Sequence, residues 1–80
     1  MTKVATDQDV LNKFKGRFEE IKQVKDDYIK SIRLAALMTD MEYVFRIPLL
    51  GAERITAFKR SFPEIMSLYQ EVKEVGVFNA

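Results

Sequence analysis

Apolar residues in the first half of the chain recur at intervals of three and four, the spacing of one helix face. This pattern predicts a long helix from about residue 7 to residue 38, with Gly16 as its one glycine and no proline. Thr6 and Asp9 have helix-capping spacing at its start, and Lys25 occupies one position of the apolar stripe. The stripe consists of Leu11, Phe14, Phe18, Ile21, Tyr28, Ile32 and Ala35.

From Leu34 onward the apolar residues move to roughly the opposite side of the predicted helix. Thr39 and Glu42 have the spacing of a capping box at this point. Either the first helix ends there and a short helix (about 40–46) follows, or one helix continues with a second apolar side. A helix over 7–38 would be about 48 Å long, whereas a compact chain of this size is roughly 30 Å across. The rest of the chain must therefore fold back along it, or a second chain must cover it.

Pro48 and Gly51 interrupt the helical pattern in the second half of the chain. A third helix is predicted from about residue 49 or 52 to residue 60. Ser61 and Glu64 have capping-box spacing around Pro63, and predict a fourth helix that ends near Gly76. No segment alternates with period two. The predicted fold is all-α, a small helical bundle with two or three shorter helices packed back on the long one. The later stripes are Ile55, Phe58 and Phe62, then Ile65, Leu68, Tyr69, Val72 and Val75.

The length of 80 residues favours a single domain that spans residues 1–80. Within it, residues 1–6 are expected to form a disordered N-terminus and residues 77–80 a tail. Cysteine and histidine are both absent, which removes disulfides, thiolate metal sites and the usual proton shuttle. Small cores without such reinforcement often gain stability by self-association. We therefore expect no metal, no cofactor and a homodimer.

Paired carboxylates are the one form of acid–base equipment in the sequence. They occur at Glu19-Glu20, at Asp26-Asp27, and at Asp40 with Glu42. Catalytic carboxylates need an enclosed site that separates their pKa values, whereas these lie among lysines on the polar side of the predicted helix. The pattern is typical of solvated ion pairs. We expect no catalytic residue and no enzymatic activity.

The net charge of +1 provides no general attraction to nucleic acid or to anionic membranes. No apolar run has the length of a signal peptide core or a membrane span, so a cytoplasmic protein without membrane association is expected. The alternative function is a nucleic-acid-binding module built on a helix-turn-helix-like segment over 40–60. It is not favoured, because that segment contains no Asn or Gln to read bases. The residues of this alternative are Arg46, Arg54, Lys59 and Arg60.

The second apolar side is rich in methionine, which is common at adaptable binding surfaces. It could be intramolecular core, a self-association interface or a groove for an unidentified protein partner. We favour a small non-catalytic interaction or regulatory protein that acts through helix–helix docking and self-association on this side. The predicted partner-binding residues are Leu34, Leu37, Met38, Met41, Val44 and Phe45.

Overall fold

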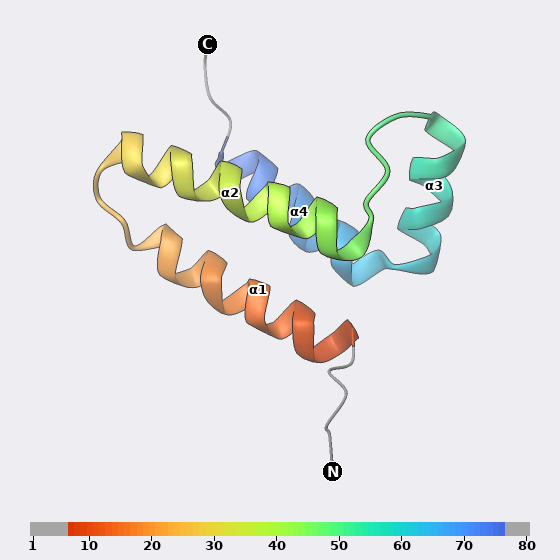
Figure 1. Ribbon diagram of the computed structural model, residues 1–80, viewed down its shortest axis with the longest axis horizontal. Helices are drawn as coiled ribbons and strands as arrows, with labels where there is room; N and C mark the ends of the chain where they lie inside the picture. The colour runs from red at the N-terminus through yellow and green to blue at the C-terminus, as the bar shows by residue number, and fades with distance from the viewer. Residues whose placement is uncertain (1–6, 77–80) are drawn as a thin grey trace.

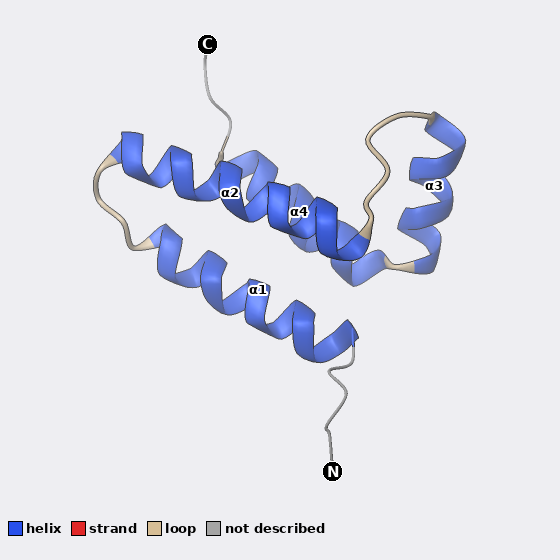
Figure 2. Ribbon diagram, in the orientation of Figure 1, coloured by secondary structure: helices blue, strands red, loops and turns tan. Residues whose placement is uncertain are grey.

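The computed structural model describes residues 7–76, which form four helices joined by short loops (Figure 1). The helices are α1 (Asp7–Lys22), α2 (Asp27–Phe45), α3 (Ala52–Ser61) and α4 (Pro63–Val75). All regular structure in the described range is helical (Figure 2), which confirms the all-α fold class. The predicted disordered N-terminus, the predicted tail and the capping residue Thr6 lie outside the described residues.

The prediction of one long N-terminal helix is wrong, because the chain turns at residues 23–26 and starts a new helix. Asp26 has extended backbone angles (φ −77°, ψ 116°), and its carboxylate accepts a hydrogen bond of 3.0 Å from the backbone N–H of Ile29. This bond satisfies one of the N–H groups that the start of a helix leaves unpaired. The turn also places Lys25 in an exposed loop, so its charge does not enter the core.

α2 is continuous through Thr39, so the helix break expected as one alternative at this residue does not occur. The hydroxyl of Thr39 donates to the carbonyl oxygen of Ala35 at 3.0 Å, within the helix. Glu42 instead accepts a hydrogen bond of 2.5 Å from the Tyr69 hydroxyl of α4. Neither side chain makes a capping contact. The capping-box spacing was therefore misleading here.

The core lies among α1, α2 and α4. α2 packs against both α1 and α4, while α1 and α4 contact each other less extensively. The apolar stripe of α1 faces α2 because the turn at 23–26 folds the two helices back to back in antiparallel directions (Figure 1). The buried residues are Leu11, Phe14, Phe18, Ile21, Leu34, Leu37, Met41, Ile47, Ile65, Met66, Leu68, Tyr69 and Val72.

Two further contacts hold α1 against α2. The rings of Phe14 and Phe45 lie 5.4 Å apart between centroids, in the tilted arrangement that aromatic pairs prefer. On the surface, the guanidinium of Arg17 forms an ion pair of 2.9 Å with Asp40. Because both charged side chains are about half exposed, this pair contributes at most about 1 kcal/mol. The aromatic contact therefore does more to fix the register of the two helices.

α3 lies to one side of the other three helices (Figure 1), and it packs against α4. The loop over 46–51 contains Pro48 and ends at Gly51, whose positive φ of 91° confirms the predicted turn. α3 has no fully buried residue, although Ile55 and Phe58 are partly buried against the core. The described chain is accordingly flat, with extents of 39 × 38 × 16 Å.

The fourth helix starts as its proline predicts but without the expected cap. Pro63 is the first residue of α4, where its missing N–H costs nothing, and Gly76 follows the last residue as predicted. The residue before the helix is Phe62, and no side-chain hydrogen bond caps the helix start. Ser61 instead ends α3, so the capping-box prediction for Ser61 and Glu64 is wrong.

None of α1 to α4, the helices of residues 7–76, combines the length and the apolar character needed to cross a lipid bilayer.

Candidate interaction surfaces

The predicted partner-binding face of α2 lies mostly in the core of the molecule. Leu34, Leu37 and Met41 are 0–2% exposed. Met38 and Phe45 are partly buried against the same cluster. α1 and α4 cover this side of the helix, so these five residues pack within one chain, and a partner could reach the buried ones only if helices separated. The remaining predicted residue, Val44, is 49% exposed at the edge of the face.

The opposite side of α2 carries a strip of uncharged residues that none of the other described residues covers. Tyr28 is 76% exposed, Ile32 52% and Tyr43 85%, while Ala35, Ala36 and Thr39 between them are also exposed. At 100° per residue, these positions fall within about a quarter to a third of the helix circumference. No charged residue lies among them. We call this strip the outer face of α2; it consists of Tyr28, Ile32, Ala35, Ala36, Thr39 and Tyr43.

The outer face is a result of the turn at residues 23–26. Tyr28, Ile32 and Ala35 were predicted to continue the core stripe of the first helix. The turn reverses the direction of the chain between α1 and α2, so Leu34, Leu37 and Met41 enter the core. Tyr28, Ile32 and Ala35 consequently face outward. The signal that could have located the turn is Asp26 three residues before Ile29, the spacing of an N-cap. The interleaved charges around Asp26 suggested ion pairs on a continuous helix instead.

The polar groups of the outer face do not need a polar partner. The Thr39 hydroxyl already donates to the Ala35 carbonyl oxygen. The two tyrosines present an apolar ring with a hydroxyl at its tip, the amphipathic form that is enriched at protein interfaces. Val44 and Ile29 extend the apolar surface along one edge, and both are close to half exposed. Along the same edge lie the charges of Arg33 and Asp40.

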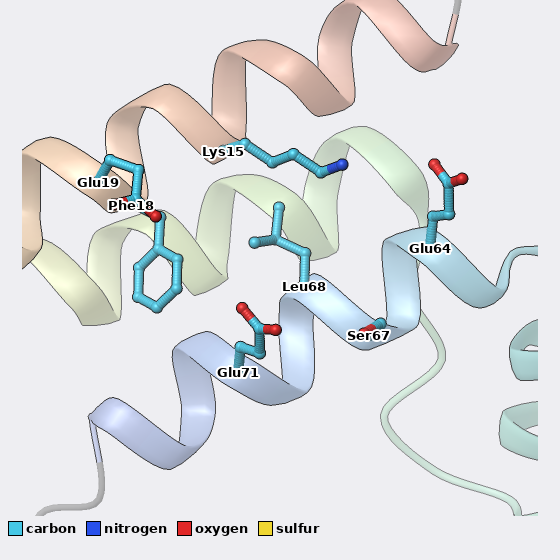
Figure 3. Close-up of a pocket in the computed structure, with 7 residues that line it drawn as sticks. All are labelled: Lys15, Phe18, Glu19, Glu64, Ser67, Leu68 and Glu71. Carbon is cyan, nitrogen blue, oxygen red and sulfur yellow. The ribbon is translucent and has the colours of Figure 1, made fainter.

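A groove of about 270 Å³ lies between α1 and α4 (Figure 3). Phe18 and Leu68 contribute its apolar surface, and the Lys15 side chain extends along it from α1 (Figure 3). Its polar rim comes from Glu19, Glu64, Ser67 and Glu71. Within residues 7–76, no group of three or more carboxylates is placed to hold a metal ion. The chain contains no histidine, so Ser67 lacks the commonest general base for a serine nucleophile.

The four basic residues of the nucleic-acid alternative do not share a surface. Arg46 ends α2 in the left-handed conformation (φ 55°), outside α3. On α3, a rotation of 100° per residue points Arg54, Lys59 and Arg60 in three directions more than 90° apart. Glu53 lies on nearly the same side of α3 as Arg60 and carries the opposite charge. This placement provides no continuous basic strip for phosphate groups.

The buried tyrosine of α4, Tyr69, lies in an environment that strongly alters its titration. Burial raises the pKa of the Tyr69 phenol well above its ordinary value, and the hydrogen bond to Glu42 and the negative charge of that carboxylate raise it further. The neutral phenol is therefore the form that the folded protein retains. Its hydroxyl is committed to linking α4 to α2 and does not line the groove of Figure 3. We assign it a structural role.

In comparisons with known proteins, no family model, no curated protein and no solved structure matches the chain.

Proposed function

We propose that this is a small non-catalytic interaction protein that works by helix–helix docking, with the outer face of α2 as its contact surface. The observation that supports the proposal is an uncharged helix strip with three large side chains, each more than half exposed. Single exposed apolar residues are common on protein surfaces, but a continuous strip of them is characteristic of an interface. The proposal retains the docking mode predicted from the sequence and moves it to the other side of the same helix.

The outer face is suited to docking because it is held rigid from behind. Leu34, Leu37 and Met41 anchor the inner side of α2 between α1 and α4. The backbone that presents the outer residues is therefore ordered before a partner arrives. Docking then incurs no cost for ordering this helix, and the large side chains of this surface that lose rotational freedom are Tyr28, Ile32 and Tyr43.

The test is a matched pair of charge substitutions. Tyr43→Asp places a charge on the outer face, whereas Leu50→Asp places one at a residue of equal exposure in the loop before α3 (85% and 84% exposed). Wild type and both variants are immobilised and assayed, by mass spectrometry, for bound protein from the native cell and for bound copies of the same chain. Circular dichroism confirms the helix content of each variant.

We expect Tyr43→Asp to lose a protein that wild type and Leu50→Asp retain. An Ile32→Asp variant should lose the same protein, since it alters the same strip. Retention of every bound protein by both outer-face variants, with helix content intact, would refute the proposed function.

A further inference from the structure

We propose that the occupant of the outer face is α2 of a second copy of this chain, packed antiparallel about a two-fold axis between Ala35 and Ala36. This inference rests on the proposed function and names the partner of the same surface. In this register, the numbers of two residues that lie opposite each other across the interface always add up to 71. Tyr28 therefore faces the partner copy's residue 43, and Ile32 faces the partner copy's residue 39.

The order of side-chain sizes along the outer face supports this register. From either end the strip begins with a tyrosine, continues four residues later with a β-branched residue, and reaches an alanine three residues after that. A two-fold axis across the helix requires such symmetry, because an isologous interface joins one patch to an identical copy of itself. The strip extends over 15 residue steps from Tyr28 to Tyr43, or about 22 Å of helix.

Small residues at the centre allow the two helices to approach closely. Ala35 and Ala36 lie at the proposed axis, with bulkier side chains only toward the ends. Helices that pack through small side chains reach the short end of the interaxial range, about 8 Å. At that separation the tyrosine rings at the ends can cover the partner's helix on either side of the contact. Each end of the interface then contains one Tyr28 and one Tyr43.

Charge complementarity favours the antiparallel arrangement over a parallel one. Arg33 and Asp40 lie on the same edge of the outer face. In an antiparallel pair, like edges meet, so Arg33 of each copy lies within about 3 Å along the axis of the position opposite Asp40 of the other copy. The Asp40 carboxylate is half exposed beside Arg17, and keeps room for a second cation. In a parallel pair, Arg33 would instead face the opposite edge near Ser31, where it finds no carboxylate.

The same edge brings two apolar residues together. Ile29 and Val44 lie at opposite ends of the edge that carries Arg33 and Asp40, and both are about half exposed (45% and 49%). Antiparallel pairing places Ile29 of one copy near Val44 of the other. The edge is thus apolar at its ends and carries opposite charges nearer its centre. In the antiparallel pair, each apolar side chain lies near an apolar one and each charge lies near the opposite charge.

The exposed area is sufficient for a specific but modest dimer. The outer face with its apolar edge offers on the order of 600 Å² per copy, so about 1,200 Å² in the pair, the lower end of specific interfaces. We therefore expect a dissociation constant in the range of about 1–100 μM, because interfaces of this small size usually give weak or transient association. Concentration series should extend from about 1 μM to 1 mM to cover this range.

Cysteine crosslinking tests both the partner and the register. The chain has no cysteine, so each introduced thiol is unique. Ile32→Cys and Thr39→Cys proteins are oxidised separately and as an equimolar mixture, and sedimentation equilibrium is measured on the wild type. In the proposed register, residues 32 and 39 of different copies are level. Two copies of residue 39 are about 10 Å apart along the axis, beyond the roughly 7 Å that a disulfide can bridge between Cα atoms.

We expect the mixed pair to crosslink at least about five times faster than either variant alone, since only it meets the geometric limit for a disulfide. Gln70→Cys, on the exposed side of α4, is the control for random collision. Ile32→Asp should raise the dissociation constant of the otherwise unchanged chain at least about tenfold, because a buried unpaired carboxylate opposes association. Leu50→Asp should leave it unchanged.

Two results would overturn the inference. Faster crosslinking of Thr39→Cys with itself than of the mixed pair would show a parallel or shifted register. A wild-type chain that remains monomeric to 1 mM would exclude a second copy as the partner. Such a monomer would leave the proposed function standing if Tyr43→Asp, but not Leu50→Asp, still lost a bound protein from the cell extract, so the two failures are distinguishable.

Discussion

The two sides of α2 are similar in residue type and opposite in environment. The inner side places Leu37 and Met41 at 0% exposure between α1 and α4. The outer side places Ile32 and Tyr43 at 52% and 85% exposure, although isoleucine is usually buried and tyrosine is buried to an intermediate degree. The comparison shows that an apolar side chain is able to enter a core, but that the direction of the preceding chain determines which apolar side chains are buried.

The position of one turn accounts for the difference. If α1 continued through residues 23–26, Tyr28 and Ile32 would extend the stripe that ends at Ile21. Because Asp26 caps a new helix instead, α2 returns along α1 with a different side inward. The inner side therefore supports the fold, and the outer side is left as the surface that we propose for docking.

The largest expected effect separates the two sides by their contribution to stability. Leu37→Ala should lower the free energy of unfolding by about 2–5 kcal/mol, because it removes a fully buried side chain and leaves a cavity. Ile32→Ala, the matched truncation on the outer side, should change the stability of the monomer by less than about 0.5 kcal/mol. Urea denaturation at low protein concentration measures both values. Equal losses in the two variants would show that the outer side is also covered within one chain.

A smaller effect is expected at the turn that makes the two sides different. Asp26→Ala should destabilise the fold by about 0.5–2 kcal/mol, because the backbone N–H of Ile29 loses its acceptor. Asp26→Ser keeps a capping oxygen and should recover most of this loss. Urea denaturation gives the stabilities. If alanine and serine were equivalent at this position, capping would not be what starts α2 here.

The smallest effect concerns two tyrosines, one on each side of the comparison. Tyr69→Phe should cost about 0.5–1.5 kcal/mol at neutral pH, because it removes the hydrogen bond to Glu42. Tyr43→Phe, which changes an exposed ring, should cost less than about 0.5 kcal/mol. Urea denaturation of both variants at pH 7 compares them directly.

The Tyr69 hydrogen bond also predicts a dependence on alkaline pH. Burial and the Glu42 carboxylate raise the pKa of the phenol in the folded state, so the unfolded chain ionises first, near its ordinary value of about 10. The contribution of Tyr69 is therefore complete below about pH 10 and is lost as the pH rises above it. Stability measured from pH 8 to 11 should fall more steeply for wild type than for Tyr69→Phe. Parallel curves would contradict this.

Much of the fold could be predicted from local patterns. The all-α class follows from spacings of three and four in every segment, and Pro48, Gly51, Pro63 and Gly76 mark helix ends that the structure confirms. These signals act on the backbone of one or two residues, so they do not depend on distant packing. The stripe of α1 is buried as predicted because no nearby turn altered its direction.

Capping patterns were less reliable, because the same residues have other partners within reach. Thr39 and Glu42 match a capping box, but a helix already in progress offers the hydroxyl a carbonyl oxygen, and α4 offers the carboxylate a phenol. The reverse holds at Asp26: its spacing from nearby lysines predicts ion pairs on a continuous helix, whereas in the structure this aspartate caps the start of α2. Only the contact between Glu42 and Tyr69 requires the helices to be assembled, whereas the hydrogen bonds of Thr39 and Asp26 are local to α2 and compete with the capping and ion-pairing partners that the sequence also offers.

By itself, the sequence determined that the chain is helical, which residues are able to form apolar faces, and that α2 has two of them. It also removed thiol and imidazole chemistry, since neither side chain is present. Only the tertiary structure decided which face of α2 is core. That choice depends on the turn at residues 23–26 and on the covering of one side by α1 and α4. The physical reason is that periodicity defines directions around a helix axis, whereas burial depends on where the neighbouring helices lie.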